Sequence, residues 1–397
     1  MPGPLEVGPL EITSLATGGA GVGRLDGRVF FVYGALPGDI TYARILKDHG
    51  RFVDASATTR VQNSPRRVIP PCPLQATCGG CPWMALSYEG QLIAKETLVR
   101  DNLIRLGGLA HPEVKPITPS PEVLGYRRRA RLHGGPEGMG YFAANSRQLL
   151  DVPDCPVLEP PLRELWTSLR RFFAGKLRAP LLIELDLGDD GSPRVALSGV
   201  DLTRTGLPPL DGVQLLSDTR PLEEGHHRRL PFSQANRAAN GLLTRKVAEW
   251  LEPAEGRHFL DIYCGSGNLS WPLLARGATV VGVEGDAGAI NRARERTPPD
   301  AAATWWVGDV GPFLKQLGPR RWSGVVINPP RTGAAAVIPH LLKLQTPRLV
   351  YVSCDPATLS RDLKQLSASY QLVAAWPFDL MPHTDHVEVV CWLAKTT

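Results

Sequence analysis

The sequence predicts an α/β protein whose C-terminal part is a Rossmann-like, doubly wound parallel sheet. From about residue 236 onward, short and almost wholly apolar segments alternate with helical stretches. Strands without a polar face are typical of parallel sheets that helices cover on both sides. One segment runs directly into a glycine turn and then a helix, as in nucleotide-binding folds of this class. The predicted strands are His258–Tyr263, Thr279–Glu284, Ala303–Val307, Gly324–Asn328, Arg348–Ser353 and Val387–Ala394.

Residues 1–62 predict a small N-terminal β-barrel of the oligonucleotide-binding (OB) type. Short alternating segments separated by glycine turns have the spacing of strands in small barrels. The six Lys/Arg of this region balance six Asp/Glu, so charge alone does not indicate RNA binding, and a structural appendage is the alternative. The predicted strands are Leu5–Ile12, Gly27–Val32, Ile40–Leu46 and Arg51–Val61.

Residues 63–235 predict an α+β insert domain. It begins with a proline-rich, basic junction at 64–71 and continues with an amphipathic helix at about 86–107. Strands such as Leu181–Leu187 and Arg194–Leu197 follow, but the pattern does not give their topology. Because 397 residues exceed one ordinary core, we expect three domains, at 1–62, 63–235 and 236–397.

Composition favours a folded protein with a polyanionic partner in a reducing compartment. The formal net charge is +5, and no basic segment followed by an apolar run opens the chain. No stretch of about 18 uncharged apolar residues occurs, so we expect no membrane association and a cytoplasmic location. The seven cysteines are unevenly placed, which favours metal ligation or catalysis over disulfides.

The glycine turn after the first strand of the sheet predicts a nucleotide-like cofactor. Gly265 and Gly267 allow close approach of the backbone, but G-S-G-N-L-S departs from the nicotinamide fingerprint. Glu284 ends the next strand, where its carboxylate can accept hydrogen bonds from both ribose hydroxyls. Asp309 closes the third strand and can reach an adenine amino group. The set predicts S-adenosylmethionine; turn glycines and helix-capping acids are the alternative.

A cysteine near the sheet predicts covalent catalysis. Asn328-Pro-Pro would suggest amino-group methylation if an aromatic residue followed, but Arg331 stands there. The next strand leads to Cys354, followed by Asp355 as predicted helix N-cap and Pro356 at the first helical position. Such a position favours the thiolate. The alternative for Cys354 is a small, buried hydrophobic residue.

A thiolate of this kind suits methylation at carbon 5 of a pyrimidine. That carbon is a poor nucleophile until a thiolate adds to carbon 6, and a base must later remove the carbon-5 proton. Glu388 is the only acid within an otherwise apolar strand, and burial would raise its pKa toward a value useful for proton transfer. A salt-bridged carboxylate on an edge strand is the alternative. His383 and His386 are further candidates for the base, or for stabilising a turn.

Four further cysteines predict a metal site. Cys72, Cys78 and Cys81 form C-x5-C-x2-C, and Cys155 is a candidate fourth ligand. Four thiolates suit either structural zinc or an iron–sulfur cluster. Zinc sites usually pair two C-x2-C knuckles, so this spacing favours [4Fe–4S]. We expect such a cluster to hold the insert together.

Together these motifs resemble the RNA 5-methyluridine methyltransferase family, which modifies tRNA or 23S rRNA. The resemblance covers essentially the whole chain. The matching features are a TRAM-like N-terminal barrel, the cysteine pattern, Phe-Ser-Gln-Ala-Asn at 232–236, Asp-x-x-Cys-Gly-x-Gly-Asn at 261–268, Asn-Pro-Pro-Arg-x-Gly at 328–333, Ser-Cys-Asp-Pro at 353–356 and Pro-His-Thr-x-His-x-Glu at 382–388.

The resemblance implies the roles of individual residues. Cys354 would be the nucleophile, Glu388 the general base, and the four clustered cysteines the [4Fe–4S] ligands. RNA would be the partner of a monomeric enzyme. Residues implied to line the S-adenosylmethionine site are Gln234, Tyr263, Asn268, Glu284, Asp309 and Asn328. A basic run is our candidate phosphate-binding segment, with a solvated strand edge as the alternative; it comprises Arg127, Arg128, Arg129 and Arg131.

One position departs from the family, which usually has Asp where this chain has Asn328. An amide both donates and accepts hydrogen bonds, so it can pair with uridine or with cytidine. Cytosine-5 enzymes of the two-cysteine kind place a cysteine in the Pro-Pro motif, which is lacking here, and uridine therefore stays the expectation. The competing hypotheses are cytidine methylation, amino-group methylation, and a non-catalytic RNA-binding factor.

Overall fold

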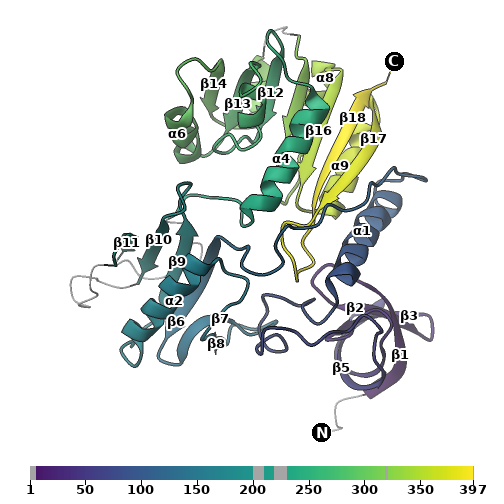
Figure 1. The fold of residues 1–397 in the computed structure, drawn as a ribbon. Coiled ribbons are helices and arrows are strands. Elements are labelled where there is room, and N and C mark those ends of the chain that lie inside the picture. Colours follow the sequence, from purple (N-terminus) through teal and green to yellow (C-terminus); the bar gives the residue numbers. More distant parts are fainter. Residues whose placement is uncertain (1–5, 200–209, 219–229, 318–320, 397) are drawn as a thin grey trace. The chain divides into compact units, whose positions relative to one another are not determined.

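The computed structural model describes residues 6–199, 210–218, 230–317 and 321–396. The chain divides into two compact units. Unit 1 comprises Met1–Ala94, Pro121–Arg237 and Met381–Asp385, and unit 2 comprises Lys95–Ser120, Ala238–Leu380 and His386–Thr397. Helix α1 (Tyr88–Arg105), which confirms the helix predicted at 86–107, gives residues to both units (Figure 1).

Unit 1 begins with a closed five-stranded barrel in the order β1-β2-β3-β5-β4, with β4 pairing back onto β1 (Figure 1). Its strands are β1 (Glu6–Leu15), β2 (Gly21–Leu25), β3 (Arg28–Tyr33), β4 (Ile40–Asp48) and β5 (Phe52–Gln62). Alternating side chains such as Leu10, Ile12 and Val32 fill the interior, so the predicted small barrel is confirmed. The sequence missed β2, and Leu5 of the first predicted strand lies outside the described residues.

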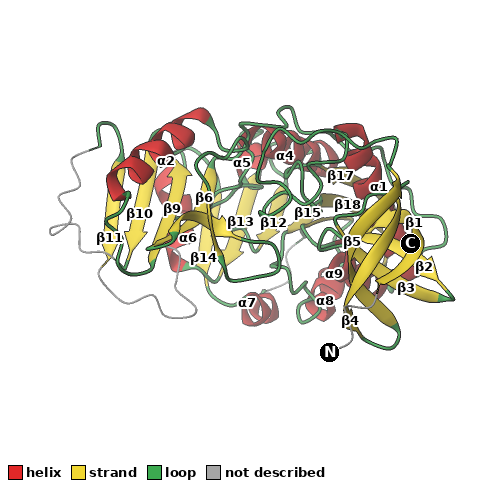
Figure 2. Cartoon of the chain, turned by 90° about the horizontal axis from the view of Figure 1, so that it is seen from below, coloured by secondary structure: helices red, strands yellow, loops and turns green. Residues whose placement is uncertain are grey.

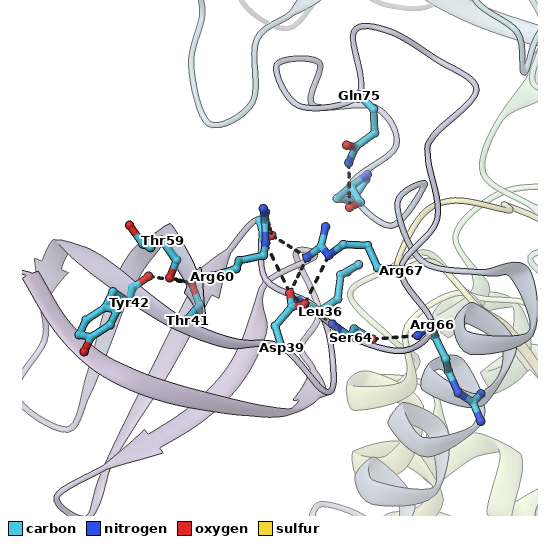
Figure 3. Close-up of polar contacts among 12 residues, drawn as sticks. Leu36, Asp39, Thr41, Tyr42, Thr59, Arg60, Ser64, Arg66, Arg67 and Gln75 are labelled. Carbon is cyan, nitrogen blue, oxygen red and sulfur yellow. Dashed lines mark hydrogen bonds and ion pairs between the residues drawn. The ribbon is translucent and has the colours of Figure 1, made fainter. Parts of the chain in front are cut away.

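A buried carboxylate ties the barrel to the chain that leaves it (Figure 3). Asp39 is wholly buried and accepts hydrogen bonds from the backbone N–H groups of Leu36 and Ser64, each at 2.7 Å. The guanidinium of Arg67 also pairs with it. Burial alone would raise the pKa of Asp39, but the hydrogen bonds outweigh burial and lower the pKa. In the basic junction at 64–71, Arg67 therefore has a structural role.

The rest of unit 1 is built on a six-stranded sheet in the order β11-β10-β9-β6-β7-β8. The strands predicted at 181–187 and 194–197 are confirmed as β9 and β10, whereas the sequence did not predict the topology or the other four strands. Helix α2 (Pro160–Phe173) packs its apolar face, including Leu162, Trp166 and Leu169, into the core of this sheet. The strands are β6 (Arg129–Gly135), β7 (Gly138–Phe142), β8 (Leu149–Asp151), β9 (Leu181–Leu187), β10 (Pro193–Ser198) and β11 (Gln214–Asp218).

Unit 2 is the predicted doubly wound sheet, with seven strands in the order β14-β13-β12-β15-β16-β18-β17. The first five are parallel and entirely or largely apolar. They are β12 (His258–Ile262), β13 (Thr279–Glu284), β14 (Ala303–Val307), β15 (Gly324–Ile327) and β16 (Arg348–Ser353). The order reverses at β12, which lies between β13 and β15, and ligands of such sheets bind at this switch point.

The last two strands differ from the prediction of a wholly parallel sheet. β18 (Glu388–Lys395) runs antiparallel to β16 and inserts between it and β17 (Tyr370–Phe378), a strand the sequence did not predict. A connection of nine residues without a helix, at 379–387, joins β17 to β18 in place of a helical crossover, and the pair is antiparallel. Lys95 and Asp379 form an ion pair of 2.6 Å, with both side chains wholly buried, next to the end of β17.

Helices cover both faces of this sheet, α4 and α5 on one and α7, α8 and α9 on the other (Figure 2). The helices are α4 (Arg237–Leu251), α5 (Trp271–Leu274), α6 (Ala287–Arg296), α7 (Val310–Gln316), α8 (Ile338–Leu344) and α9 (Pro356–Leu366). Among the residues that the structure describes, no helix is long and apolar enough to cross a membrane.

Candidate active site

The glycine turn after β12 is fixed by a carboxylate at the end of β13. Tyr263, Gly265 and Gly267 have positive φ values of 60°, 55° and 87°. The two oxygens of Glu284 accept hydrogen bonds from the backbone N–H of Gly265 at 3.2 Å and of Asp286 at 3.0 Å. A Cβ at Gly267 would lie 2.9 Å from the Trp271 ring, so glycine is required there for packing as well as for its φ.

Other residues predicted for the cofactor site lie in the same unit. The phenol of Tyr263 has a raised pKa, first through burial and then through the charges of Asp309 and Glu284, so these two strand-end carboxylates lie near it. Asn268 exchanges two hydrogen bonds with Asn240 of α4, at 2.9 and 3.0 Å. The sequence missed Asn240, because nothing marks a helical asparagine as the partner of a turn residue.

The two remaining residues predicted for the cofactor site, Asn328 and Gln234, belong to different units. The backbone N–H of Asn328 donates to the carbonyl of Ile262 at 3.1 Å, which holds the loop after β15 beside the glycine turn. Gln234 belongs to unit 1. There its segment is tied to the N-terminal side of β6, where the N–H of Arg128 donates to the carbonyl of Ala235 at 2.9 Å.

Three side chains converge beyond the ends of β15 and β16. The charge of Arg331, in the loop after β15, acts on the thiol of Cys354, which follows β16. The charge of Glu388, the first residue of β18, acts on Cys354, and the charge of Arg331 acts on Glu388. The structure therefore brings the predicted nucleophile and base together. It also adds a cation, Arg331. In the sequence this position is notable only because it lacks the aromatic residue that amino-group methylation would suggest.

The electrostatic setting of Cys354 differs from the prediction. Asp355 caps α9 and its carboxylate accepts from the backbone N–H groups of Ala357 and Thr358, at 2.9 and 2.8 Å. These amides are therefore not directed at the sulfur. Burial and the charge of Glu388 raise the pKa of Cys354, while Arg331 opposes them and lowers it. The backbone N–H of Cys354 and the charge of Arg331 both lower the pKa of the thiol, and the contribution of Arg331 is the one that the sequence did not predict.

Glu388 has the raised pKa that its apolar strand predicted. Burial raises the pKa of Glu388 from 4.5 to about 7, against the opposing charge of Arg331. Its neighbour across the sheet is Phe378 of β17. A carboxyl group with this pKa is divided between its acid and base forms near neutral pH, as a general base requires.

Comparison with known proteins agrees with this geometry. The description tRNA (Uracil-5-)-methyltransferase belongs to the family model that matches residues 316–396. An uncharacterized RNA methyltransferase of Bdellovibrio bacteriovorus is 31% identical over 395 residues, covering 97% of this chain and 94% of that protein. The 23S rRNA (uracil(1939)-C(5))-methyltransferase RlmD of an Enterobacter species is 33% identical over 414 residues, 96% of this chain and 94% of that protein. The chain belongs to the RNA uracil-C5 methyltransferase family.

A solved member of the family has the same fold over nearly the whole chain. It is Pyrococcus abyssi tRNA (uracil-54, C5)-methyltransferase in complex with S-adenosyl-L-homocysteine, with a TM-score of 0.73 and 25% identity. The match covers 97% of this chain and 100% of that one.

The two histidines of this family's Pro-His-Thr motif lie in different units, His383 in unit 1 and His386 in unit 2. His383 is buried in a left-handed turn, with φ 69°. Its backbone N–H donates to the side-chain oxygen of Gln91 at 2.7 Å, and its carbonyl accepts from the N–H of Trp83 at 3.0 Å. These contacts suit the turn-stabilising role rather than that of a base.

The four clustered cysteines of this uracil-C5 methyltransferase lie in unit 1 and are free thiols. Burial, and then the charge of Cys155, raises the pKa of Cys81 to about 12, and charges of Cys78 and Cys72 act on it too. The Tyr141 hydroxyl lies 4.0 Å from the sulfur of Cys155. Among the described residues, no three His, Cys, Asp or Glu side chains have the arrangement of a metal-ion site.

The basic run at 127–131 is mostly structural, contrary to the predicted phosphate-binding segment. Arg127 lies beside the cysteine cluster, where its charge acts on Cys78, Cys81 and Cys155, and its Nε donates to the carbonyl of Arg129. Arg128 is buried and donates to the carbonyls of Leu187 and Gly188, because it lies where β6 pairs with β9. Arg129 donates to the carbonyl of Ser233 at 2.8 Å. Arg131 is exposed and can still meet a phosphate.

Proposed function

We propose that this enzyme transfers the methyl group of S-adenosylmethionine to carbon 5 of a uridine in RNA, through a covalent bond between Cys354 and the base. The convergence of Cys354, Arg331 and Glu388 at the strand ends of unit 2 carries the proposal. A nucleophile, its stabilising cation and a base with a pKa near neutrality are the groups that this reaction requires.

The proposed cycle leaves the enzyme unchanged. The thiolate of Cys354 adds to carbon 6, forming an S–C6 bond and pushing the ring electrons toward carbon 5. Carbon 5 then takes the methyl group from the sulfonium, and S-adenosylhomocysteine is released. Glu388 removes the remaining carbon-5 proton, the C5–C6 double bond re-forms, and the S–C6 bond breaks to return the thiolate. Glu388 then releases the proton to the solvent and is a carboxylate again.

Arg331 is the group that we expect to make the thiolate available. Burial and Glu388 both raise the pKa of Cys354, so without a cation the thiol would stay protonated. The guanidinium is always charged, and its charge lowers the pKa of the thiol. Arg331 therefore acts on the addition step, whereas Glu388 acts on elimination.

The methyl donor is proposed to bind at the switch point of the sheet. Glu284 lies at the end of β13 and Asp309 beyond β14, where ribose and adenine would be recognised. Tyr263, Asn268 and Asn328 come from the loops after β12 and β15. Gln234 of the Phe-Ser-Gln-Ala-Asn motif is proposed as a contact from unit 1. The relative from Pyrococcus abyssi was solved with the demethylated product of the same donor.

The four cysteines of unit 1 are proposed to hold a [4Fe–4S] cluster. The chemistry of the side chains supports the proposal: the four thiols act electrostatically on one another, and the guanidinium of Arg127 offsets their negative charge when they ionise. When bound, the cluster cross-links the loop at 72–81 to Cys155 and so holds unit 1 together. Purified protein should be brown, with about four irons per chain. Stoichiometric zinc in a colourless protein would contradict this proposal.

The RNA substrate is proposed to be 23S rRNA. The relative from Enterobacter, which matches over almost its full length, is named as a 23S rRNA enzyme at 33% identity, whereas the solved tRNA enzyme is 25% identical. Mass spectrometry of RNA from a deletion strain, mapped to the nucleotide, tests this. Loss of methyluridine from tRNA alone would overturn the assignment to rRNA, and loss of a methylcytidine would overturn uridine.

The covalent mechanism is tested with RNA that contains 5-fluorouridine. Fluorine replaces the proton that the base must remove, so the adduct should persist and migrate as a stable protein–RNA complex. Cys354→Ala should abolish both the adduct and methyl transfer. Cys391→Ala, the same change at a buried cysteine of β18, is the matched control and should retain both. Methylation at full rate by Cys354→Ala, or a methyl group on nitrogen, would sink the proposal.

A further inference from the structure

A buried carboxylate lies beside the site of Cys354 and takes no part in the proposed chemistry. Asp362 is on α9 and is 3% exposed. One of its oxygens, Oδ2, accepts hydrogen bonds from the hydroxyl of Tyr351 at 2.6 Å and from the backbone N–H of Ala334 at 2.6 Å. Tyr351 is wholly buried in β16. Burying a carboxylate costs free energy unless it is well paired. The burial of Asp362 and the hydrogen bonds that it accepts therefore need an explanation.

The backbone geometry of the loop shows an independent adaptation to the same carboxylate. Gly333 has φ +83°, and a Cβ added there would lie 2.8 Å from Oδ2 of Asp362. It would also lie 3.4 Å from Thr358 of the same helix. Glycine is therefore needed for both the turn and the close approach. The N–H of Gly333 donates to the carbonyl of Pro330 at 2.9 Å, which closes a turn around Arg331.

These contacts join the two elements that present the reacting groups. The loop from Asn328 to Ala334 carries Arg331, and α9 begins at Pro356, two residues after Cys354. Arg331 is itself exposed, and a long exposed side chain has many rotamers. Its guanidinium can stay near the thiol reproducibly only if its backbone is held. The contacts of Asp362 and Gly333 supply that restraint.

We propose that Asp362 is a positioning residue, which holds the Arg331 loop against α9 so that the guanidinium stays near Cys354. Tyr351 and Gly333 belong to the same clamp: the tyrosine orients the carboxylate, and the glycine lets the loop reach it. The catalytic meaning of this clamp rests on the proposed function, but its effect on Cys354 does not depend on RNA.

The test is the pH dependence of Cys354 alkylation in the iron-loaded protein, without RNA. Iodoacetamide labelling is quantified on the Cys354 peptide by mass spectrometry. Arg331→Met defines complete loss of the cation, and we expect labelling about tenfold slower at pH 8, because one charge in contact shifts a pKa by about one unit or more. Asp362→Ala should slow labelling in the same direction. Asp362→Asn keeps an acceptor oxygen and should stay near the wild type.

Controls separate positioning from general loosening. Leu251→Ala leaves a cavity in the core of unit 2 without touching the loop, and should leave the alkylation profile unchanged. Where Asp362→Ala does not fold, Tyr351→Phe and Gly333→Ala weaken the same clamp and should shift the profile partly. An unchanged profile in the clamp variants, or an equal shift in Leu251→Ala, would refute the clamp. Failure of Arg331→Met to shift it would also refute the clamp, whereas the fluorouridine adduct reports separately on the proposed function.

Discussion

Replacing the proposed general base should make the protein more stable, and only at higher pH. The folded state raises the pKa of Glu388 from 4.5 to about 7. Between these two pH values the carboxyl group of Glu388 is mostly ionised in the unfolded chain but mostly protonated in the folded protein. The carboxyl group therefore supports the folded state below pH 4.5, and that support is lost as the pH rises through about 7. Glutamine has the same shape and never ionises, so Glu388→Gln escapes the loss.

The magnitude follows from the two pKa values. Each pKa unit corresponds to about 1.4 kcal/mol, so the full penalty for ionising Glu388 in the folded protein is about 3 kcal/mol. Weighting by the ionised fractions, Glu388→Gln should exceed the wild type in free energy of unfolding by about 1 kcal/mol at pH 5.5 and about 3 kcal/mol at pH 8.5. Catalytic activity should be lost, because the amide of the introduced glutamine cannot accept the proton from carbon 5.

Urea unfolding at these two pH values, followed by tryptophan fluorescence, measures the difference. Glu295→Gln changes an exposed glutamate of α6 in the same unit, and its difference from the wild type should stay near zero at both pH values. If the difference in free energy of unfolding between Glu388→Gln and the wild type does not grow with pH, the carboxyl group of Glu388 titrates as it does in water. The assignment of this side chain as a base poised near neutrality would then fail.

Three other changes test separate parts of the molecule. Lys95→Met leaves Asp379 buried without its ion-pair partner and should lower the free energy of unfolding by about 3–5 kcal/mol; a loss under 1 kcal/mol in a urea titration would contradict this. Cys81→Ser removes one proposed cluster ligand and should reduce bound iron well below the wild-type content, as measured by a colorimetric iron assay, whereas unchanged iron would exclude this thiol as a ligand. Asn328→Asp should retain methylation of uridine, because a carboxylate still accepts from N3–H, and loss of product in a radiolabelled methyl-transfer assay would count against that contact.

The architecture of unit 2 could be predicted from sequence because its strands are apolar throughout. The five parallel strands differ from their predicted bounds by at most one residue at either end. β17 was missed, since Tyr370–Phe378 mixes exposed and buried positions and shows no regular alternation. The six-stranded sheet of unit 1 was also beyond prediction. Its central pair joins β6 to β9 across about fifty residues, and no local pattern encodes such pairing.

The candidate site shows the same limit at the level of single residues. Cys354 and Glu388 could be predicted because each carries an unusual side chain at a strand end. The charge of the site could not, because it depends on which groups meet in space. Asp355 satisfies the helix amides locally, and so the cation that reaches Cys354 comes from a different loop. The local sequence therefore could not show that a charge from a distant segment acts on the thiol.

One cation facing two acids has a consequence for the order of events. Arg331 opposes the raised pKa of both Cys354 and Glu388, and the charge of Glu388 raises the pKa of the thiol. Two anions beside one guanidinium are therefore unfavourable. Once the sulfur has bonded to carbon 6 it no longer carries a charge, and Arg331 is then free to support the carboxylate that must accept the carbon-5 proton. Arg331→Met should therefore slow both formation and resolution of the adduct on natural uridine. A variant that slowed only formation would show that the guanidinium serves the thiolate alone.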